Sequence, residues 1–239
     1  MTPLSERFRD WMARHDDPED PATPAATVLV LRDSGDGPEV LMVQRNSKGA
    51  FASNWVFPGG KVDAEDFDAT NDIEAASRRA AAREAAEETD VLIESTALVP
   101  FSHWMPPPVV PRRFSTWFYA TEVPAGTDGH VTIDGGEIVD HLWVTPSDAL
   151  AKHAAGEVEL VPPTWVTLRH LHGHPSTADL LHAIALREPR FYVTRRIAVD
   201  PPTVAWHGDA GYDTGDASLP GPRHRLVMDP RGWHFEQPD

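Results

Sequence analysis

Three glutamates stand close together in the first half of the chain, at Glu84, Glu87 and Glu88. In a helix, which turns by ~100° per residue, these positions fall within about one third of the circumference, so their oxygens converge. Glu84 and Glu88 are four residues apart, and this like-charge pair destabilises an isolated helix by roughly 0.2–0.5 kcal/mol. A local rule broken in this way indicates function, and we expect the cluster to bind a divalent cation.

The chemistry that suits such a cluster is the hydrolysis of a phosphoanhydride. Mg²⁺ and Mn²⁺ prefer carboxylate and carbonyl oxygens and keep several waters, one of which can become a nucleophile. We expect Glu84 and Glu88 to be the main ligand pair, while Glu87 completes the site or accepts the proton from water. Arg83 can orient Glu87 one helical turn away, and Gly60 permits a tight loop whose carbonyl reaches the same ion.

The composition excludes several other classes of protein. With 37 acidic and 21 basic residues the formal net charge is −16, a field that repels nucleic acid, so we expect no nucleic-acid partner. The absence of cysteine excludes disulfides, thiolate nucleophiles and thiolate-bound zinc. The polar N-terminal segment and the short apolar run at 25–31 predict neither a signal peptide nor a membrane span, and we expect a cytoplasmic protein.

The glutamates need a scaffold, and its pattern is that of alternating strands and helices. Periodicity and turn residues predict strands at 27–31 and 39–43 joined by a long loop, a further loop at 49–61, and a helix from about 71 to 89. Asn71 and Glu74 form a capping-box pattern for that helix. Beyond it we expect strands at 98–103, 114–123 and 137–144, and helices at 146–153, 163–172 and 177–187.

The two ends of the chain differ from this middle part. Residues 4–15 have the spacing of a short amphipathic helix, followed by an acidic, proline-rich linker. The tail is rich in glycine, proline and aromatic residues, with an expected strand at 191–197 and an expected hairpin around 229–232. We therefore divide the chain into an N-terminal helix and linker (1–24), a catalytic domain (25–188) and a β-rich C-terminal extension packed on it (189–239). For the tail, a lid, a dimer contact and simple decoration all stay open.

The glutamate cluster and its glycine turn resemble the Nudix box, a loop–helix–loop that binds metal and cleaves nucleoside diphosphate derivatives; the matching residues are Gly60, Arg83, Glu84, Glu87 and Glu88. The resemblance implies an α/β fold, the Nudix α/β/α sandwich with a mixed central sheet, here with an added helical segment and the β-rich extension. The segment between Gly60 and Arg83 is about nine residues longer than usual, so Asp66 and Glu74 compete as the acid that lies within the box. Asp90 replaces the usual final glycine and can adopt the same left-handed conformation.

A narrower resemblance concerns the substrate. The long box, with His103-Trp104, the segment 111–114, the segment 134–138 and the segment 162–164, is similar to a branch that includes peroxisomal coenzyme A diphosphatases, over roughly residues 25–185. It implies a small-molecule nucleotide derivative as partner, namely coenzyme A or acyl-CoA cleaved to adenosine 3′,5′-bisphosphate and a phosphopantetheine. The alternatives are an ADP-ribose, NADH or oxidised-nucleotide pyrophosphatase and a non-catalytic ligand sensor of the same fold. A homodimer is left open.

Several further side chains are candidates for this chemistry. Arg45, Arg112 and Arg113 can grip phosphates with their planar guanidinium groups, although adjacent arginines on a strand face opposite ways, so at most one of Arg112 and Arg113 reaches a site. Glu137 is either an additional ligand or base, or a turn residue. Trp104 and Trp117 can stack an adenine, but aromatic residues in strands usually belong to the core, which we favour. For His170, His172 and His174 we expect surface positions and no zinc site.

Overall fold

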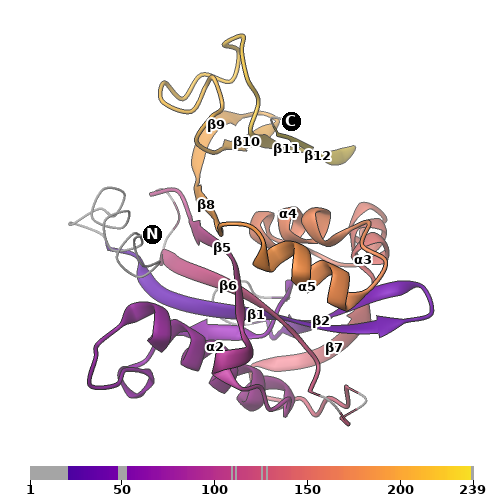
Figure 1. Ribbon diagram of the computed structural model, residues 1–239. Coiled ribbons are helices and arrows are strands. Elements are labelled where there is room, and N and C mark those ends of the chain that lie inside the picture. Colours follow the sequence, from indigo (N-terminus) through magenta and orange to yellow (C-terminus); the bar gives the residue numbers. More distant parts are fainter. Residues whose placement is uncertain are drawn as a thin grey trace.

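The computed structural model describes residues 21–47, 53–108, 110, 112–124, 126–127 and 129–237. The helix expected at 4–15 lies outside these residues. A sheet of eight strands forms the centre of the molecule, and a second sheet of four strands lies beside it (Figure 1). No helix of the described ranges is long and apolar enough to cross a membrane.

The centre of the large sheet is β1 (Thr23–Ser34), which is flanked on both sides. It pairs antiparallel with β2 (Gly37–Arg45) and parallel with β6 (Phe114–Glu122). The long loop expected between the first two strands is wrong, because pairing continues as far as Ser34 and Gly37 and leaves a two-residue turn. The Ser34 hydroxyl closes this turn by donating to the Gly37 carbonyl at 2.8 Å and accepting from the Asp36 N–H at 3.2 Å.

The outer strands complete a mixed sheet, as expected from the sequence. β5 (Val99–Met105) pairs antiparallel with β6 and parallel with β8 (Arg190–Val193), while β7 (Ile138–Val144) pairs antiparallel with β2. The segment 49–61 is not all loop, because it contains β3 (Trp55–Val56), paired with β2, and β4 (Gly59–Lys61), paired with β1. Pattern alone missed these two strands, which are too short to show an alternation.

Helices cover both faces of this sheet (Figure 1). α2 (Ile73–Thr89) lies on one face, and α3 (Pro146–Ala154), α4 (Pro162–Leu171) and α5 (Thr177–Ala185) lie on the other. Two short 3₁₀ turns, η1 (Ala64–Asp66) and η2 (Ser95–Ala97), precede and follow α2. The expected cap at Asn71 is wrong: Asn71 has φ +54°, and the side chain of Asp72 accepts from the Glu74 N–H at 2.9 Å. Asp90 ends the helix in the left-handed conformation, as expected.

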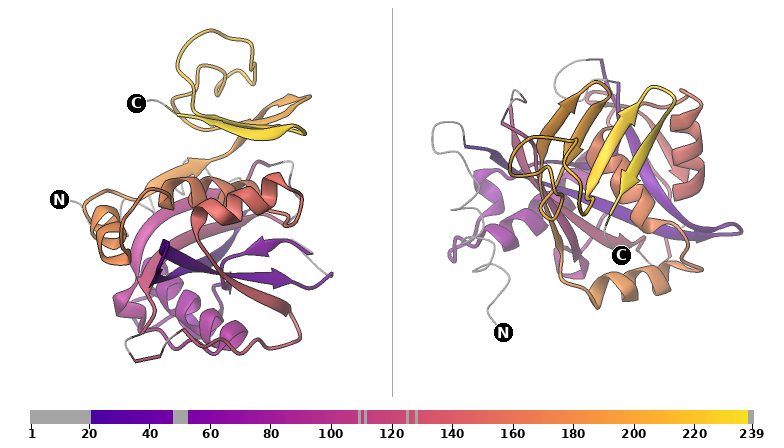
Figure 2. Two further views of the ribbon diagram at one scale, coloured as in Figure 1. Left: turned by 90° about the vertical axis from the view of Figure 1, so that its right-hand side faces the viewer. Right: turned by 90° about the horizontal axis from the view of Figure 1, so that it is seen from above.

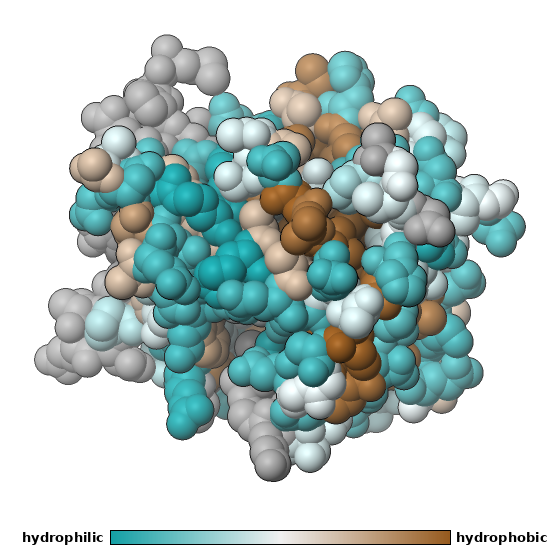
Figure 3. Space-filling model, turned by 90° about the horizontal axis from the view of Figure 1, so that it is seen from below, coloured by the Kyte–Doolittle hydropathy of each residue, from teal (hydrophilic) through white to brown (hydrophobic). Residues whose placement is uncertain are grey.

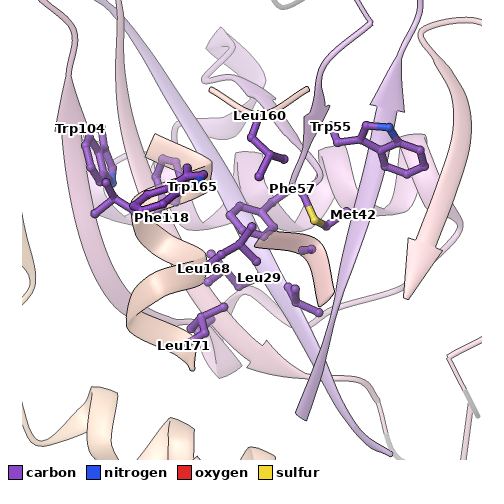
Figure 4. Close-up of a cluster of buried hydrophobic side chains, with 14 of the residues drawn as sticks. Leu29, Met42, Trp55, Phe57, Trp104, Phe118, Leu160, Trp165, Leu168 and Leu171 are labelled. Carbon is purple, nitrogen blue, oxygen red and sulfur yellow. The ribbon is translucent and has the colours of Figure 1, made fainter. Parts of the chain in front are cut away.

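Alternating residues of β1 build the two cores. Leu29 and Leu31 face α4 and α5 in a cluster rich in aromatic residues, part of which is shown in Figure 4. Val28 and Val30 face α2, whose fully buried apolar side chains are alanines; the small methyl groups let the helix approach the sheet closely. Seen from below, the side of α2 in Figure 1, the surface is largely hydrophilic with hydrophobic groups gathered near its middle (Figure 3).

The tail forms the second sheet, which lies above α4 in Figures 1 and 2. Its strands are antiparallel in the order β12-β11-β10-β9, with bounds β9 (Arg195–Val199), β10 (Pro202–Ala205), β11 (Arg225–Asp229) and β12 (Gly232–Glu236). The hairpin around 229–232 is confirmed. The single strand expected at 191–197 is wrong, because the chain passes from the large sheet to the small one at Thr194, whose hydroxyl accepts from the Trp206 ring N–H at 3.0 Å. Trp206 in turn packs edge-on against Trp104, with ring centroids 5.7 Å apart.

Candidate metal and phosphoanhydride site

Two glutamates of α2 lie against the glycine turn that begins β4. The Gly59 N–H donates to Oε2 of Glu88 at 2.9 Å. The carboxylate of Glu84 lies so close over Gly60 that a β-carbon at this position would overlap its Oε1, Cδ and Oε2 atoms. The pairing of β4 with β1 holds the turn in place, and α2 packs on the same strand. Gly60, Glu84 and Glu88, which the sequence predicts to share one site, thus lie together in the structure.

Arg83 connects the helix to the turn and to the loop after it. Its Nη2 donates to the Lys61 carbonyl at 3.1 Å, and its Nη1 donates to Glu84 at 2.9 Å and to Glu87 at 3.2 Å. The expected pairing of Arg83 with Glu87 is therefore present, but Glu87 lies at the rim of the site with 58% of its side chain exposed. Arg83 therefore holds the Glu84 carboxylate towards the turn and the Glu87 carboxylate towards solvent.

Of the two acids that compete within the lengthened box, Asp66 is the one that contacts Arg83. Nε and Nη2 of Arg83 donate to its two oxygens at 3.1 and 2.9 Å, and the carboxylate is buried. Its competitor Glu74 lies in the first turn of α2 and pairs with Arg78 at 3.0 Å. The contact with Arg83 favours Asp66 over Glu74 as the acid of the box.

Arg45 and Glu137 are further neighbours of the glutamate cluster. Arg45, the last residue of β2, donates from Nη1 to Glu88 Oε1 at 3.4 Å and from Nη2 to Glu137 Oε2 at 2.6 Å. Arg45 is therefore not a remote surface residue but a direct neighbour of the site. Glu137 stands just before β7, with 69% of its side chain exposed and its carboxylate turned to the same arginine.

Side-chain hydrogen bonds fix the conformation of the loop that carries Glu137. The carboxylate of Asp134 accepts from the N–H groups of Gly136, Glu137 and Ile138 at 2.9–3.1 Å. Burial raises the pKa of Asp134, but these three hydrogen bonds together lower it by more. The pKa is therefore below its ordinary value. Asn46 donates from its side chain to the Gly136 carbonyl at 2.7 Å. Asn46 was not predicted, and only its place at the end of a strand could have indicated it.

The electrostatics of the cluster favour an added cation. Burial raises the pKa of Glu88 to about 8, against the Gly59 hydrogen bond and the charge of Arg45, which lower it. Burial also raises the pKa of Glu84, against the hydrogen bond and charge of Arg83, while Glu87 and Glu137 raise it further. Each ionised carboxylate therefore lacks full compensation in this environment, and a positive charge beside both would stabilise the ionised forms.

The donor set fits a hard divalent cation. Glu84 and Glu88 offer carboxylate oxygens next to the Gly60 backbone, and Mg²⁺ takes one or two carboxylates while keeping several waters. No group of three His, Cys, Asp or Glu side chains in the described chain forms a ready-made ligand set. The fit therefore rests on the glutamate pair and the glycine turn, into which a β-carbon could not be placed without displacing Glu84.

Arg112 and Arg113 do not contact the glutamates. Arg112 is exposed with φ +56°, and Arg113 is buried just before β6. The hydrogen-bond partners of the site glutamates within the described residues are Arg45, Arg83 and Gly59, so neither Arg112 nor Arg113 joins the cluster.

The aromatic candidates and His170 belong to the packing of the fold, whereas His172 is exposed, as expected. Trp104 and Trp117 are core residues, as favoured from the sequence. His170 is not a free surface residue: it lies half-buried, bonded to the Tyr192 hydroxyl at 2.9 Å.

Comparison with known proteins shows the family and the fold of the chain. The model of the NUDIX domain family matches residues 21–163. The chain resembles the crystal structure of a NUDIX hydrolase from Alicyclobacillus acidocaldarius with a TM-score of 0.59 and 22% identity, covering 70% of this chain and 98% of that one. It also resembles the NUDIX domain of Shewanella oneidensis NrtR complexed with ADP ribose, with a TM-score of 0.48 and 18% identity over 67% and 94% of the two chains. A search of curated proteins found no match.

The chain belongs to the NUDIX domain family, since the family model spans more than half of it. This confirms the expected fold class and the family resemblance, and it supports a pyrophosphohydrolase. The branch within the family and the substrate are a separate question.

Proposed function

We propose that this protein is a metal-dependent diphosphatase that hydrolyses the phosphoanhydride of a nucleoside diphosphate derivative. The observation that carries the proposal is the contact of Glu84 and Glu88 with the Gly59-Gly60 turn, which aims two partly compensated carboxylates at one volume. A non-catalytic ligand sensor would not need these carboxylates, and all of them are present. Mg²⁺ or Mn²⁺ bound there would neutralise phosphate charge and activate water.

Different residues of the chain would bind the metal ion, position its ligands and accept the proton. Glu84 and Glu88 would hold the ion, and the Gly60 carbonyl would be a further oxygen donor. Arg83 fixes Glu84 from behind through its bonds to Asp66 and Lys61. The proton of the attacking water passes to Glu137 or Glu87. The built loop around Asp134 supports Glu137 in this role, because it fixes the backbone on which the carboxylate stands.

For the substrate we propose coenzyme A or acyl-CoA. The support is the sequence resemblance of the long box and of the segments 111–114, 134–138 and 162–164 to coenzyme A diphosphatases. Cleavage would yield adenosine 3′,5′-bisphosphate and (acyl-)phosphopantetheine. The partner is a small molecule, consistent with a surface charge that disfavours nucleic acid.

A substrate panel with purified protein tests both parts. Coenzyme A, acetyl-CoA, ADP-ribose, NADH and 8-oxo-dGTP are incubated with Mg²⁺ or Mn²⁺, and the products are identified by mass spectrometry. We expect metal-dependent release of adenosine bisphosphate from coenzyme A, reduced at least ~10²-fold in Glu84→Gln. Glu122→Gln, an exposed glutamate at the end of β6, is the matched control.

The outcomes separate the reaction from the substrate. Turnover of ADP-ribose or NADH alone would retain the diphosphatase and replace coenzyme A as its substrate. Full activity of Glu84→Gln would refute the metal assignment.

A further inference from the structure

The guanidinium of Arg45 joins two carboxylates of the site. One terminal nitrogen, Nη1, lies 3.4 Å from Glu88 Oε1, and the other, Nη2, lies 2.6 Å from Glu137 Oε2. Glu88 uses its second oxygen for the Gly59 N–H. Oε1, the oxygen that faces Arg45, has no other hydrogen-bond partner among the described residues.

We propose that Arg45 is an exchangeable counter-ion of the metal site, which yields Glu88 to the metal ion and then binds a substrate phosphate. The inference rests on the proposed function and adds that Arg45 and the metal ion compete for Glu88. A guanidinium and a divalent ion repel each other, and both are attracted to the Glu88 carboxylate, which already pairs with Arg45. Metal binding at Glu88 therefore displaces Arg45, and Arg45 in turn weakens metal binding.

Arg45 differs in this respect from Arg83, the other arginine of the site. Arg83 is tied to Asp66, to Glu84, to Glu87 and to a backbone carbonyl, so the loss of one contact leaves the others in place. The two side-chain contacts of Arg45 are both with carboxylates of the catalytic cluster. Its side chain is 23% exposed, which leaves one side open to solvent and to a ligand.

The destination of the released group follows from charge and geometry. In a chain with a net charge of −16, an anionic substrate needs a local cation. The planar guanidinium matches two phosphate oxygens in the way it matches carboxylate oxygens. Arg45 reaches from the end of β2 to the glutamate cluster, so a phosphate bound beside that cluster is within its range.

Release of Arg45 also changes Glu137. Its backbone stays in place, because Asp134 and Asn46 hold the loop without Arg45. Its carboxylate, however, loses its positive partner and becomes available to accept a proton. The exchange thus couples metal binding to the exposure of a candidate base.

The test compares Arg45→Met with the wild type. Both proteins are stripped with chelator, and Mn²⁺ affinity is measured by titration calorimetry at low ionic strength. We expect Mn²⁺ to bind at least about five-fold more tightly to Arg45→Met, because a competing cation is gone. We also expect KM for the substrate to rise more than kcat falls, because a phosphate contact is lost.

Matched variants make the result decisive. Arg32→Met removes an arginine that pairs with Glu39 in the β1–β2 hairpin and should leave the Mn²⁺ affinity unchanged. Arg45→Lys keeps the positive charge but lacks the planar guanidinium. Its Mn²⁺ affinity should lie between those of the wild type and Arg45→Met. It replaces the methionine variant if that protein does not fold. Mn²⁺ binding that requires Glu84 but is unchanged or weaker in Arg45→Met overturns the exchange and leaves the proposed function standing. An unchanged KM overturns the transfer to substrate, and a wild type that binds no Mn²⁺ overturns the proposed function as well.

Discussion

Arg83 donates one hydrogen bond to each carboxylate oxygen of Asp66, at 3.1 Å from Nε and 2.9 Å from Nη2. Asp66 ends η1 and Arg83 lies in the middle of α2, so the pair closes the lengthened segment between them. Residues 67–72 connect η1 to α2, and the rest of the segment forms the first turns of the helix. Glu84 and Glu88 of this helix nevertheless lie against the glycine turn.

Replacing Asp66 by Asn should destabilise the protein by about 2–4 kcal/mol, because a buried ion pair is broken and one Arg83 donor then faces an amide N–H₂. Glu74→Gln is the control, since that pair is more exposed, and its loss should cost less than ~1 kcal/mol. Urea denaturation of the three proteins measures both values. If Glu74→Gln proved the more damaging change, the assignment of Asp66 as the acid of the box would be wrong.

The two glycines of the turn should respond differently to alanine. A β-carbon on Gly60 meets only the Glu84 carboxylate, the end of a flexible side chain, whereas one on Gly59 meets the Ala26 carbonyl and the Thr27 backbone. Gly60→Ala should therefore lower Mn²⁺ affinity about ten-fold with a stability loss below ~1 kcal/mol, and Gly59→Ala should lose more than ~2 kcal/mol. Calorimetric titration and urea denaturation distinguish them. Equal metal affinity in Gly60→Ala and wild type would contradict the placement of Glu84.

The parts of the fold that follow a long periodic pattern could be predicted from the sequence. α2 and the main strands depend on local propensity and on alternation, and both agree with the final burial. β3 and β4 could not be found in this way, because two or three residues carry no period and their pairing is set by distant strands. The switch of sheet at Thr194 likewise depends on Trp206, which follows it by twelve residues.

In the candidate site, too, local pattern predicts some residues, and others depend on pairing between distant strands. Glu84 and Glu88 could be predicted because helical spacing alone puts them on one face. The bridge from Arg45 to Glu137 joins residues 92 positions apart and needs the pairing of β2 with β7. Arg112 and Arg113, which precede β6, illustrate the converse: their residue type suits phosphate, but neither contacts the site glutamates, so their role in substrate binding stays a prediction.

The stability of the protein without metal should depend on pH through Glu88. Burial raises its pKa to about 8 in the folded chain, against about 4.3 for an unfolded glutamate. The folded state holds this proton more tightly, so the stabilisation is full below about pH 4 and is lost as the pH rises towards 8. Urea midpoints of chelator-treated protein should therefore fall between pH 5 and 8, and Glu88→Gln should remove much of that fall.

The comparison needs a matched glutamate, and Glu122→Gln serves because it is exposed. It should keep the wild-type pH dependence. A wild-type curve with the same slope as Glu88→Gln would show that Glu88 ionises normally, and the argument for a cation beside it would lose its electrostatic support.

The C-terminal sheet contains a buried ion pair of its own. Nε and Nη2 of Arg225 on β11 each donate to an oxygen of Asp209, at 2.7 and 2.5 Å, and Asp209 also accepts from the N–H groups of Gly211 and His224. Burial raises the pKa of Asp209, but these bonds lower it to about 2. The pair thus fixes the loop before β11 to the strand.

Arg225→Met should destabilise this sheet by about 3–5 kcal/mol, because it leaves the Asp209 carboxylate buried without its cation. The double variant Asp209→Asn/Arg225→Met should recover part of that loss, since no unpaired charge remains. Hydrogen exchange followed by mass spectrometry should show faster exchange in β9 to β12 for the single variant, with α2 less affected, because the two regions belong to different packing clusters. Uniform acceleration across both regions would instead mean that the small sheet and the catalytic fold unfold as one cooperative unit.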